Sequence, residues 1–173
     1  MYQYQSEFMS MAVPAAIQSQ RMTSVLASVT LAQSILESGW GRSALAMKAK
    51  NFFGIKATAH LVPNQYIEMP THEFVDGRST PTMAKFARYA TPDESFLAHA
   101  ALIANAPRYA PAMAAIRSGA KKFAEELQAC GYSTNPKYAA SLMELVDEFD
   151  LTQYDLPPTP EAPAQAQAKE KAA

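Results

Sequence analysis

The sequence is poor in the residues that several common classes of site require. It has one cysteine, Cys130, so no disulfide can form within the chain. It has 6 glycines in 173 residues and neither a GxxxxGK[ST] nor a GxGxxG pattern, which argues against a phosphate-binding loop. Its 3 histidines show no HxxxH or HExxH spacing, so we expect no metal and no other cofactor.

Long apolar runs and a charge excess are absent as well. No run approaches the ~18 apolar residues that cross a membrane, so we expect no membrane insertion. The net charge of −1 gives no bulk attraction to nucleic acid or to an anionic membrane, so neither is expected as a partner. The N-terminal residues lack the basic and apolar regions of a signal peptide, which predicts synthesis in the cytoplasm without one.

What remains is the composition of one folded domain, 49% hydrophobic and 18% charged. We assign residues 1–155 to this domain and the Pro/Ala/Gln-rich residues 156–173 to a disordered tail. The domain should begin with a helical block from residue 6 to about residue 56, with Pro14 in a first helical turn. Within it Val29, Ala32 and Leu36, widened by Ile35, form an apolar stripe.

Stop and start signals divide the rest of the chain. Gly39 should end the helix that carries the stripe, and Ser43 should cap a short helix to about residue 50. "TPDE" predicts a helix capped by Thr91, with Glu94 reaching back and with Phe96, Ala100 and Ile103 on its buried face. Three further helices are expected at about 107–117, 120–130 and 136–149, the second closed by Gly131 and the third opened by Asn135-Pro136.

Residues 57–90 read differently, because prolines interrupt them and "THEFVDGRST" has the Asp-Gly pair of a tight hairpin. The order of helices, a small antiparallel hairpin and more helices predicts an α+β fold that is mainly helical. We expect two lobes, with an active-site cleft beside the hairpin lobe.

"ILESGWGRSALA", residues 35–46, places Glu37 near the end of an apolar helix and close to Trp40, the only tryptophan. Apolar neighbours raise a carboxyl pKa, which suits a general acid. A glycosidase needs a second carboxylate across the scissile bond, and the hairpin region offers three candidates, Glu68, Glu73 and Asp76. Aromatic side chains that could stack on sugar rings include Tyr109 and Tyr138.

The stretch "LAQSILESGWGRSALAMKAKNFFGIKA", residues 31–57, resembles the signature of the glucosaminidases of glycoside hydrolase family 73. That family includes the peptidoglycan hydrolase domain of flagellar rod-assembly proteins. The resemblance continues through "THEFVDG", "AKFARYATPDESFLAHAALI", "NAPRYA" and "CGYSTNPKYAASL", so it covers about residues 10–150. It implies a lysozyme-like fold.

The resemblance also implies roles for individual residues. Glu37 matches the family's proton donor, Glu73 its second carboxylate, and Tyr132 a tyrosine that orients or stabilises the site. The positions that shape the cleft and contact the glycan are matched by Trp40, Asn51, Phe53 and Gly54.

The expected reaction is hydrolysis of the β-1,4 bond after N-acetylglucosamine in peptidoglycan strands. Glu73 would either activate a water or, with Tyr132, stabilise an intermediate formed by the substrate's own acetamido group. Muramidase, lytic transglycosylase and inactive glycan-binding module are the alternatives. We expect a monomer that acts on the cell wall, either as a phage lysis enzyme released by a holin or as an effector of a secretion machine.

Overall fold

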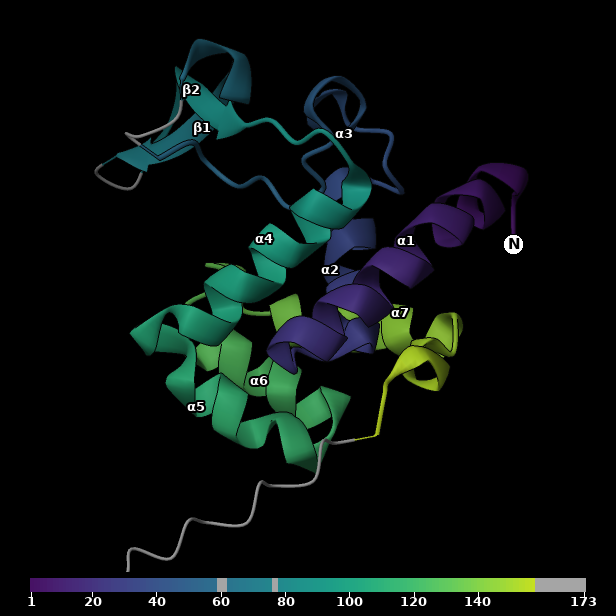
Figure 1. Cartoon of the computed structure of the whole chain (residues 1–173). Helices are drawn as coiled ribbons and strands as arrows, with labels where there is room; N and C mark the ends of the chain where they lie inside the picture. Colours follow the sequence, from purple (N-terminus) through teal and green to yellow (C-terminus); the bar gives the residue numbers. More distant parts are fainter. Residues whose placement is uncertain (59–61, 76–77, 158–173) are drawn as a thin grey trace, which may run out of the picture.

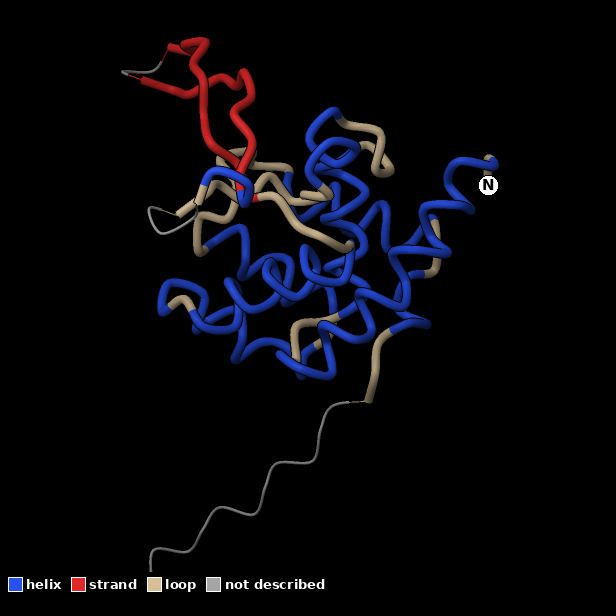
Figure 2. The backbone as a smooth tube through the Cα atoms, turned by 45° about the horizontal axis from the view of Figure 1, so that its top comes forward, coloured by secondary structure: helices blue, strands red, loops and turns tan. Residues whose placement is uncertain are grey.

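The computed structural model describes residues 1–58, 62–75 and 78–157. In these ranges seven α-helices form one body, and a two-stranded antiparallel hairpin projects from it (Figure 1, Figure 2). The elements are α1 (Gln3–Thr23), α2 (Ala27–Ser38), α3 (Ala44–Ala49), β1 (Tyr66–Val75), β2 (Arg78–Ala87), α4 (Pro92–Asn105), α5 (Ala110–Ala115), α6 (Ala120–Ala129) and α7 (Tyr138–Glu148). Short 3₁₀ turns are η1 (Pro63–Gln65), η2 (Pro107–Tyr109), η3 (Ile116–Ser118) and η4 (Leu151–Tyr154). The predicted α+β, mainly helical fold is confirmed.

Helix α1 is longer than the sequence predicts, because it begins at Gln3 and holds Pro14 in its interior. The prediction of Pro14 in a first turn is therefore wrong. The helix tolerates the missing N–H because Pro14 lies on its exposed side, while Phe8, Ala12 and Ala16 on the other side are buried in the core. Packing of this face, chiefly against α4, outweighs the local preference of proline.

Helix α2 is the central helix of the body and contacts α1, α6, α7 and η4. Its residues from Ala27 to Ile35 are all buried, so the predicted stripe of Val29, Ala32 and Ile35 lies in the core. Leu36 does not belong to it: the side chain is 42% exposed. A helix buried on all sides has no single apolar stripe, and α2 meets solvent only at its last turn.

The predicted helix ends agree with the structure. Gly39 ends α2 in the left-handed conformation, with φ 57°. The Ser43 hydroxyl accepts a hydrogen bond from the Ala46 N–H at 3.1 Å and caps α3. Thr91 caps α4 in the same way, and the Glu94 carboxyl accepts a hydrogen bond from the N–H of Ala90.

The later helices are also close to their predicted positions. The buried face of α4 carries Phe96, Ala100 and Ile103, as expected. Helix α6 is followed by Gly131 with φ 74°, which closes it. The predicted helix at 107–117 is instead η2, α5 and η3 in succession, because Pro107 and Pro111 each remove a backbone donor.

The hairpin pairs Tyr66 with Ala87 at its base and Val75 with Arg78 at its end. The Asp76-Gly77 turn predicted from the sequence lies outside the described residues. Pro70 and Pro81 fit within these strands because a two-stranded sheet consists of edge strands only, where a missing N–H need not break a ladder bond. The hairpin therefore forms despite its prolines.

The two ends of the domain are tied together beside α2. The Asp155 carboxylate accepts hydrogen bonds from the Ser28 N–H at 2.8 Å and from the Ser28 hydroxyl at 2.7 Å. The Gln20 side chain hydrogen-bonds to both backbone groups of Leu156. Of the tail predicted from residue 156, the structure describes only residues 156 and 157. The disorder of the tail therefore stays a prediction. In the part of the chain described here no helix is long and apolar enough to span a bilayer.

Candidate active site

Glu37 lies in the last turn of α2, one turn after Gln33, at the point where the central helix reaches solvent. After Ser38, which ends the helix, Gly39, Trp40 and Gly41 all have left-handed backbone conformations, with φ 57°, 61° and 72°. This run reverses the chain sharply into α3. It leaves the carboxyl of Glu37 at a fixed helix end rather than on a loop.

The indole of Trp40 anchors the reversal on its other side. Its ring makes edge contacts with Tyr4, Phe8 and Phe149, at centroid distances of 6.4, 5.8 and 4.8 Å. Trp40 therefore joins the end of α2 to α1 and to the segment after α7. The structure places it as a support for the helix end that carries Glu37.

Two tyrosines lie beside Glu37. Tyr138 opens α7 and Tyr132 lies in the turn after α6, and their rings stack at 5.4 Å. Tyr109 is tilted against Tyr132 at 6.0 Å, and the Arg108 guanidinium lies 4.8 Å from the centre of the Tyr109 ring. Arg108 also donates hydrogen bonds to the carbonyls of Cys130 and Gly131, so it holds the turn that carries Tyr132. Three of the predicted site residues are thus brought together with Glu37.

The environment of Glu37 changes its acidity. Although the residue is exposed, the protein on its inner side removes part of the carboxyl's hydration, which raises its pKa. A hydrogen bond with the Tyr138 hydroxyl opposes this effect. Burial is the main cause that raises the pKa of both tyrosines, and the charge of Glu37 raises it further, so both stay protonated. The cluster can therefore hold a proton on Glu37 at higher pH than water would allow.

Two residues of this cluster were missed by the sequence analysis. Gln33 donates a hydrogen bond to the Tyr138 hydroxyl at 3.0 Å, and the His99 Nε2 is 2.9 Å from the Tyr132 hydroxyl oxygen. Both are fully buried polar side chains. Gln33 could have been found from its spacing, because it lies four residues before Glu37 and residues four apart share one face of a helix. His99 lies 33 residues before its partner and gives no such local signal.

The predicted cleft residues at 51–54 form a loop below the cluster. Asn51 is buried, and its amide donates to the carbonyls of Ile55 and Ala87 while its oxygen accepts from the N–H of Ile55. Phe53 stacks on the His99 ring at 3.9 Å. Gly54 has φ 67°, the left-handed conformation that glycine allows. Asn51 and Phe53 are therefore placed where they support the site from within.

Comparison with known proteins shows the family. The chain matches the glucosaminidase family, described as mannosyl-glycoprotein endo-beta-N-acetylglucosaminidase, over residues 13–151. It belongs to this family, glycoside hydrolase family 73. The resemblance drawn from the sequence is thus confirmed, and the chain is a glycoside hydrolase by family.

Two individual relatives agree with this family assignment. The chain is 40% identical to the exo-glucosaminidase LytG of Bacillus subtilis over 76% of its own length and 46% of that protein. It is 33% identical to the peptidoglycan hydrolase FlgJ of Salmonella typhimurium over 80% of its length and 44% of that protein. The chain therefore spans about half the length of the curated relatives it matches.

Solved structures match the fold. The catalytic domain of the autolysin Auto from Listeria monocytogenes superimposes with a TM-score of 0.79 at 30% identity, covering 90% of this chain and 89% of that one. A C-terminally truncated glycoside hydrolase domain of Salmonella typhimurium FlgJ gives a TM-score of 0.67 at 30% identity, covering 84% of this chain and 97% of that one. The lysozyme-like fold is confirmed by these neighbours.

The second carboxylate predicted for this glucosaminidase lies on the hairpin. Glu73 is in β1, where it pairs with Thr80 of β2. Of the alternatives, Glu68 forms an exposed ion pair with Lys85 at 3.7 Å, and Asp76 lies outside the described residues. Which of the three acts with Glu37 stays a prediction.

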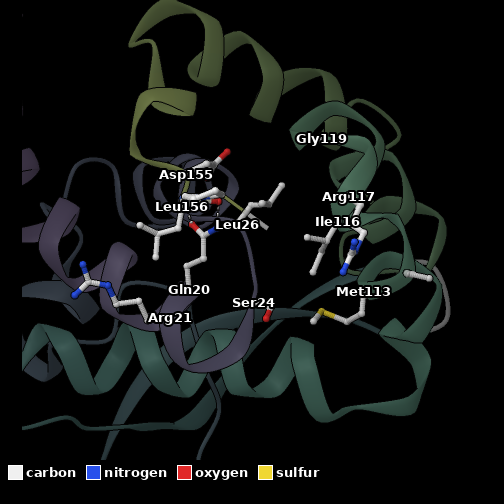
Figure 3. A pocket seen from close by; sticks show the side chains of 12 residues that line it. Gln20, Arg21, Ser24, Leu26, Met113, Ile116, Arg117, Gly119, Asp155 and Leu156 are labelled. Atoms are coloured by element: carbon white, nitrogen blue, oxygen red, sulfur yellow. Dashed lines mark hydrogen bonds between the residues drawn. The ribbon is translucent and has the colours of Figure 1, made fainter. Parts of the chain in front are cut away.

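A cavity of about 590 Å³ lies in another part of the glucosaminidase domain. Figure 3 shows it between Gln20 and Arg21 of α1, Arg117 of η3 and the chain at Asp155 and Leu156. None of the predicted site residues lines it. Among the described residues that line it the one acid is Asp155, which already accepts two hydrogen bonds from Ser28, so the cavity is separate from the cluster around Glu37 in both place and chemistry.

Proposed function

We propose that the chain hydrolyses the β-1,4 bond after N-acetylglucosamine within peptidoglycan strands, with Glu37 as the general acid. The observation that carries the proposal is the position of Glu37: it ends a rigid buried helix, and it has a raised pKa and a tyrosine hydroxyl as hydrogen-bond partner. FlgJ is named a peptidoglycan hydrolase, which supports the choice of substrate, and LytG is named an exo-glucosaminidase, which supports cleavage after N-acetylglucosamine.

The acid step follows from the site. A protonated Glu37 donates its proton to the leaving sugar oxygen, and the carboxylate that forms is stabilised by the Tyr138 hydroxyl. Glu73 then acts from the hairpin, either as the base for a water or as a stabiliser of the intermediate formed by the acetamido group. Tyr132, which is half-buried, supplies aromatic surface against the sugar rings, and the buried rings of Tyr109 and Tyr138 support it from within. Trp40, Asn51, Phe53 and Gly54 keep that surface in shape.

Analysis of the products tests this proposal directly. Purified protein is incubated with peptidoglycan sacculi, the new reducing ends are reduced with borohydride, and the fragments are identified by mass spectrometry. Reduced N-acetylglucosamine ends are the expected result. Reduced N-acetylmuramic acid ends would identify a muramidase, 1,6-anhydro ends a lytic transglycosylase, and unchanged sacculi a binding module.

The matched variants are Glu37→Gln and Glu125→Gln, which make the same change at the proposed acid and at an exposed acid of α6. Glu37→Gln should lower the rate by about 10²–10⁴-fold, the range for loss of a general acid. Glu125→Gln should keep the wild-type rate. Equal activity of the two variants would end the assignment of Glu37.

The biological setting belongs to the same proposal. Delivery to the wall by a holin or by a secretion machine predicts that added protein lyses whole Gram-negative cells only after the outer membrane is permeabilised. Lysis of untreated cells would contradict that delivery. Size-exclusion chromatography should give a monomer.

A further inference from the structure

Two buried polar side chains stand directly behind the tyrosine pair, on the side away from solvent. Gln33 of α2 is 0% exposed and His99 of α4 is 1% exposed. Each contacts one tyrosine oxygen, Gln33 that of Tyr138 and His99 that of Tyr132. Polar groups are rarely buried this deeply unless a hydrogen bond compensates, because removing them from water costs free energy.

The direction of the Gln33 bond follows from its chemistry. The amide nitrogen can only donate, so the Tyr138 oxygen must accept at 3.0 Å. The reversed amide would leave both of its N–H groups without a partner in the core, which is worse than leaving one N–H and the carbonyl unpaired. Because the Tyr138 oxygen is the acceptor in this bond, the single hydrogen of the Tyr138 hydroxyl is left to point toward Glu37.

The direction of the His99 bond follows from its unpaired nitrogen. Burial lowers the pKa of His99 to about 3, so the ring is neutral and carries one proton. Within the described ranges its Nδ1 has no hydrogen-bond partner. A buried N–H without a partner is rarer than an unpaired acceptor, so the proton belongs on Nε2. His99 then donates to Tyr132, and the Tyr132 hydrogen is also free to face the site.

We propose that Gln33 and His99 are positioning residues, which donate to the two tyrosine oxygens from the buried side and so direct the Tyr132 hydrogen to the Tyr138 oxygen and the Tyr138 hydrogen to Glu37. The inference rests on the proposed function, because it concerns the same acid. When Glu37 gives up its proton, the carboxylate meets the Tyr138 hydroxyl as a donor that is already oriented, and no rearrangement is needed. The two hydroxyls also hydrogen-bond with each other, so the donors act on a connected network.

The pair makes a testable change in the acidity of Glu37. The hydrogen bond with Tyr138 lowers the pKa of Glu37, so loss of its orientation should raise that pKa. Since the acid works in its protonated form, the basic limb of the pH–rate profile should then move to higher pH. The other ionisable groups described next to the cluster are Tyr109, Arg108 and Cys130, and none of them is changed by the variants.

The experiment replaces each donor by an apolar side chain of similar shape. Gln33→Met and His99→Phe should each lower kcat about tenfold, the effect of about 1.4 kcal/mol, and move the basic limb upward. His99→Gln, which can place an N–H near the Nε2 position, should restore most of the rate. Gln20→Met makes the same change at a buried glutamine remote from the cluster and should leave kcat and the pH profile unchanged.

The melting temperatures of the variants distinguish a positioning role of Gln33 and His99 from a merely structural one. Gln33→Met and His99→Phe remove the two buried unpaired atoms, Gln33 Oε1 and His99 Nδ1, so the melting temperature should stay the same or rise. Wild-type kcat and pH profile in both variants would overturn the proposal. A fall in melting temperature in step with activity, without rescue by His99→Gln, would overturn it as well.

Two measurements by NMR judge the inference even if the protein releases no sugar ends and the proposed function fails. The ¹⁵N shifts of the His99 ring should show the proton on Nε2, and a proton on Nδ1 would refute the His99 half. A ¹³C titration should give Glu37 a higher pKa in Gln33→Met than in wild type. An unchanged pKa would refute the Gln33 half.

Discussion

The turn after α2, the helix that carries Glu37, contains two glycines that should respond very differently to the same substitution. Gly39 and Gly41 are both left-handed, with φ 57° and 72°. A Cβ on Gly39 would meet no atom within 4 Å. A Cβ on Gly41 would lie 2.9 Å from Cδ2 and 3.2 Å from Cε2 of Phe8. The pair therefore separates backbone strain from lack of space.

The expected costs follow from these contacts. Gly39→Ala should lose only the strain of a left-handed alanine, about 1–2 kcal/mol of unfolding free energy. Gly41→Ala should lose this and a further amount of about 1–3 kcal/mol, the usual cost of overpacking a core. Phe8 cannot yield easily, because it is 5% exposed and held by the rings of Trp40 and Phe52.

Urea unfolding followed by far-UV circular dichroism measures the difference, with the emission of the single tryptophan as a second probe. In thermal unfolding each kcal/mol corresponds to about 2–4 °C for a domain of this size. If Gly41→Ala were no less stable than Gly39→Ala, Phe8 would not be a fixed wall of the turn, and the packing account would be refuted.

Two further predictions concern the site and its support. Because the native state raises the pKa of Glu37, charging this group weakens the fold as pH rises above the unfolded-state value of about 4.5. Glu37→Gln should therefore melt higher than wild type at pH 7 and at the same temperature near pH 3.5; a lower melting temperature at pH 7 would contradict the raised pKa. Asn51→Asp should turn a carboxylate oxygen toward the carbonyls of Ile55 and Ala87, which Asn51 contacts at 2.8 and 2.9 Å. It should cost about 2–4 kcal/mol in urea unfolding, and Asn64→Asp on the exposed η1 turn is the control, with no measurable loss.

Local signals explain which parts of the fold could be predicted. Gly39, Ser43 and Thr91 act on the backbone of their own turn, so helix ends were readable from neighbouring residues. The start of α1 was not, because its first residues are held by contacts with distant elements, and these outweigh the signal of Pro14. Leu36 was misplaced for a related reason, since the sequence alone does not show that α2 is surrounded on all sides.

The residues of the candidate site also divide into those that the sequence could predict and those that it could not. Glu37 could be singled out from its apolar neighbours, and the family motif added Tyr132. The hydrogen-bond partners behind the tyrosines could not be found, because Gln33 and His99 become polar core residues only when α2, α4 and the turn after α6 meet. A sequence pattern shows which residues carry the chemistry more readily than it shows which residues orient them.

The closure of the domain beside α2 bears on how this enzyme could be attached to other modules. The bonds from Ser28 and Gln20 hold the chain as far as Leu156, and the described chain ends on the side of the helical body away from the hairpin (Figure 1). A binding domain, a surface anchor or a fluorescent protein joined there would leave the approach to Glu37 and the hairpin open. Fusions that cut into residues 155–156 should instead loosen the central helix itself.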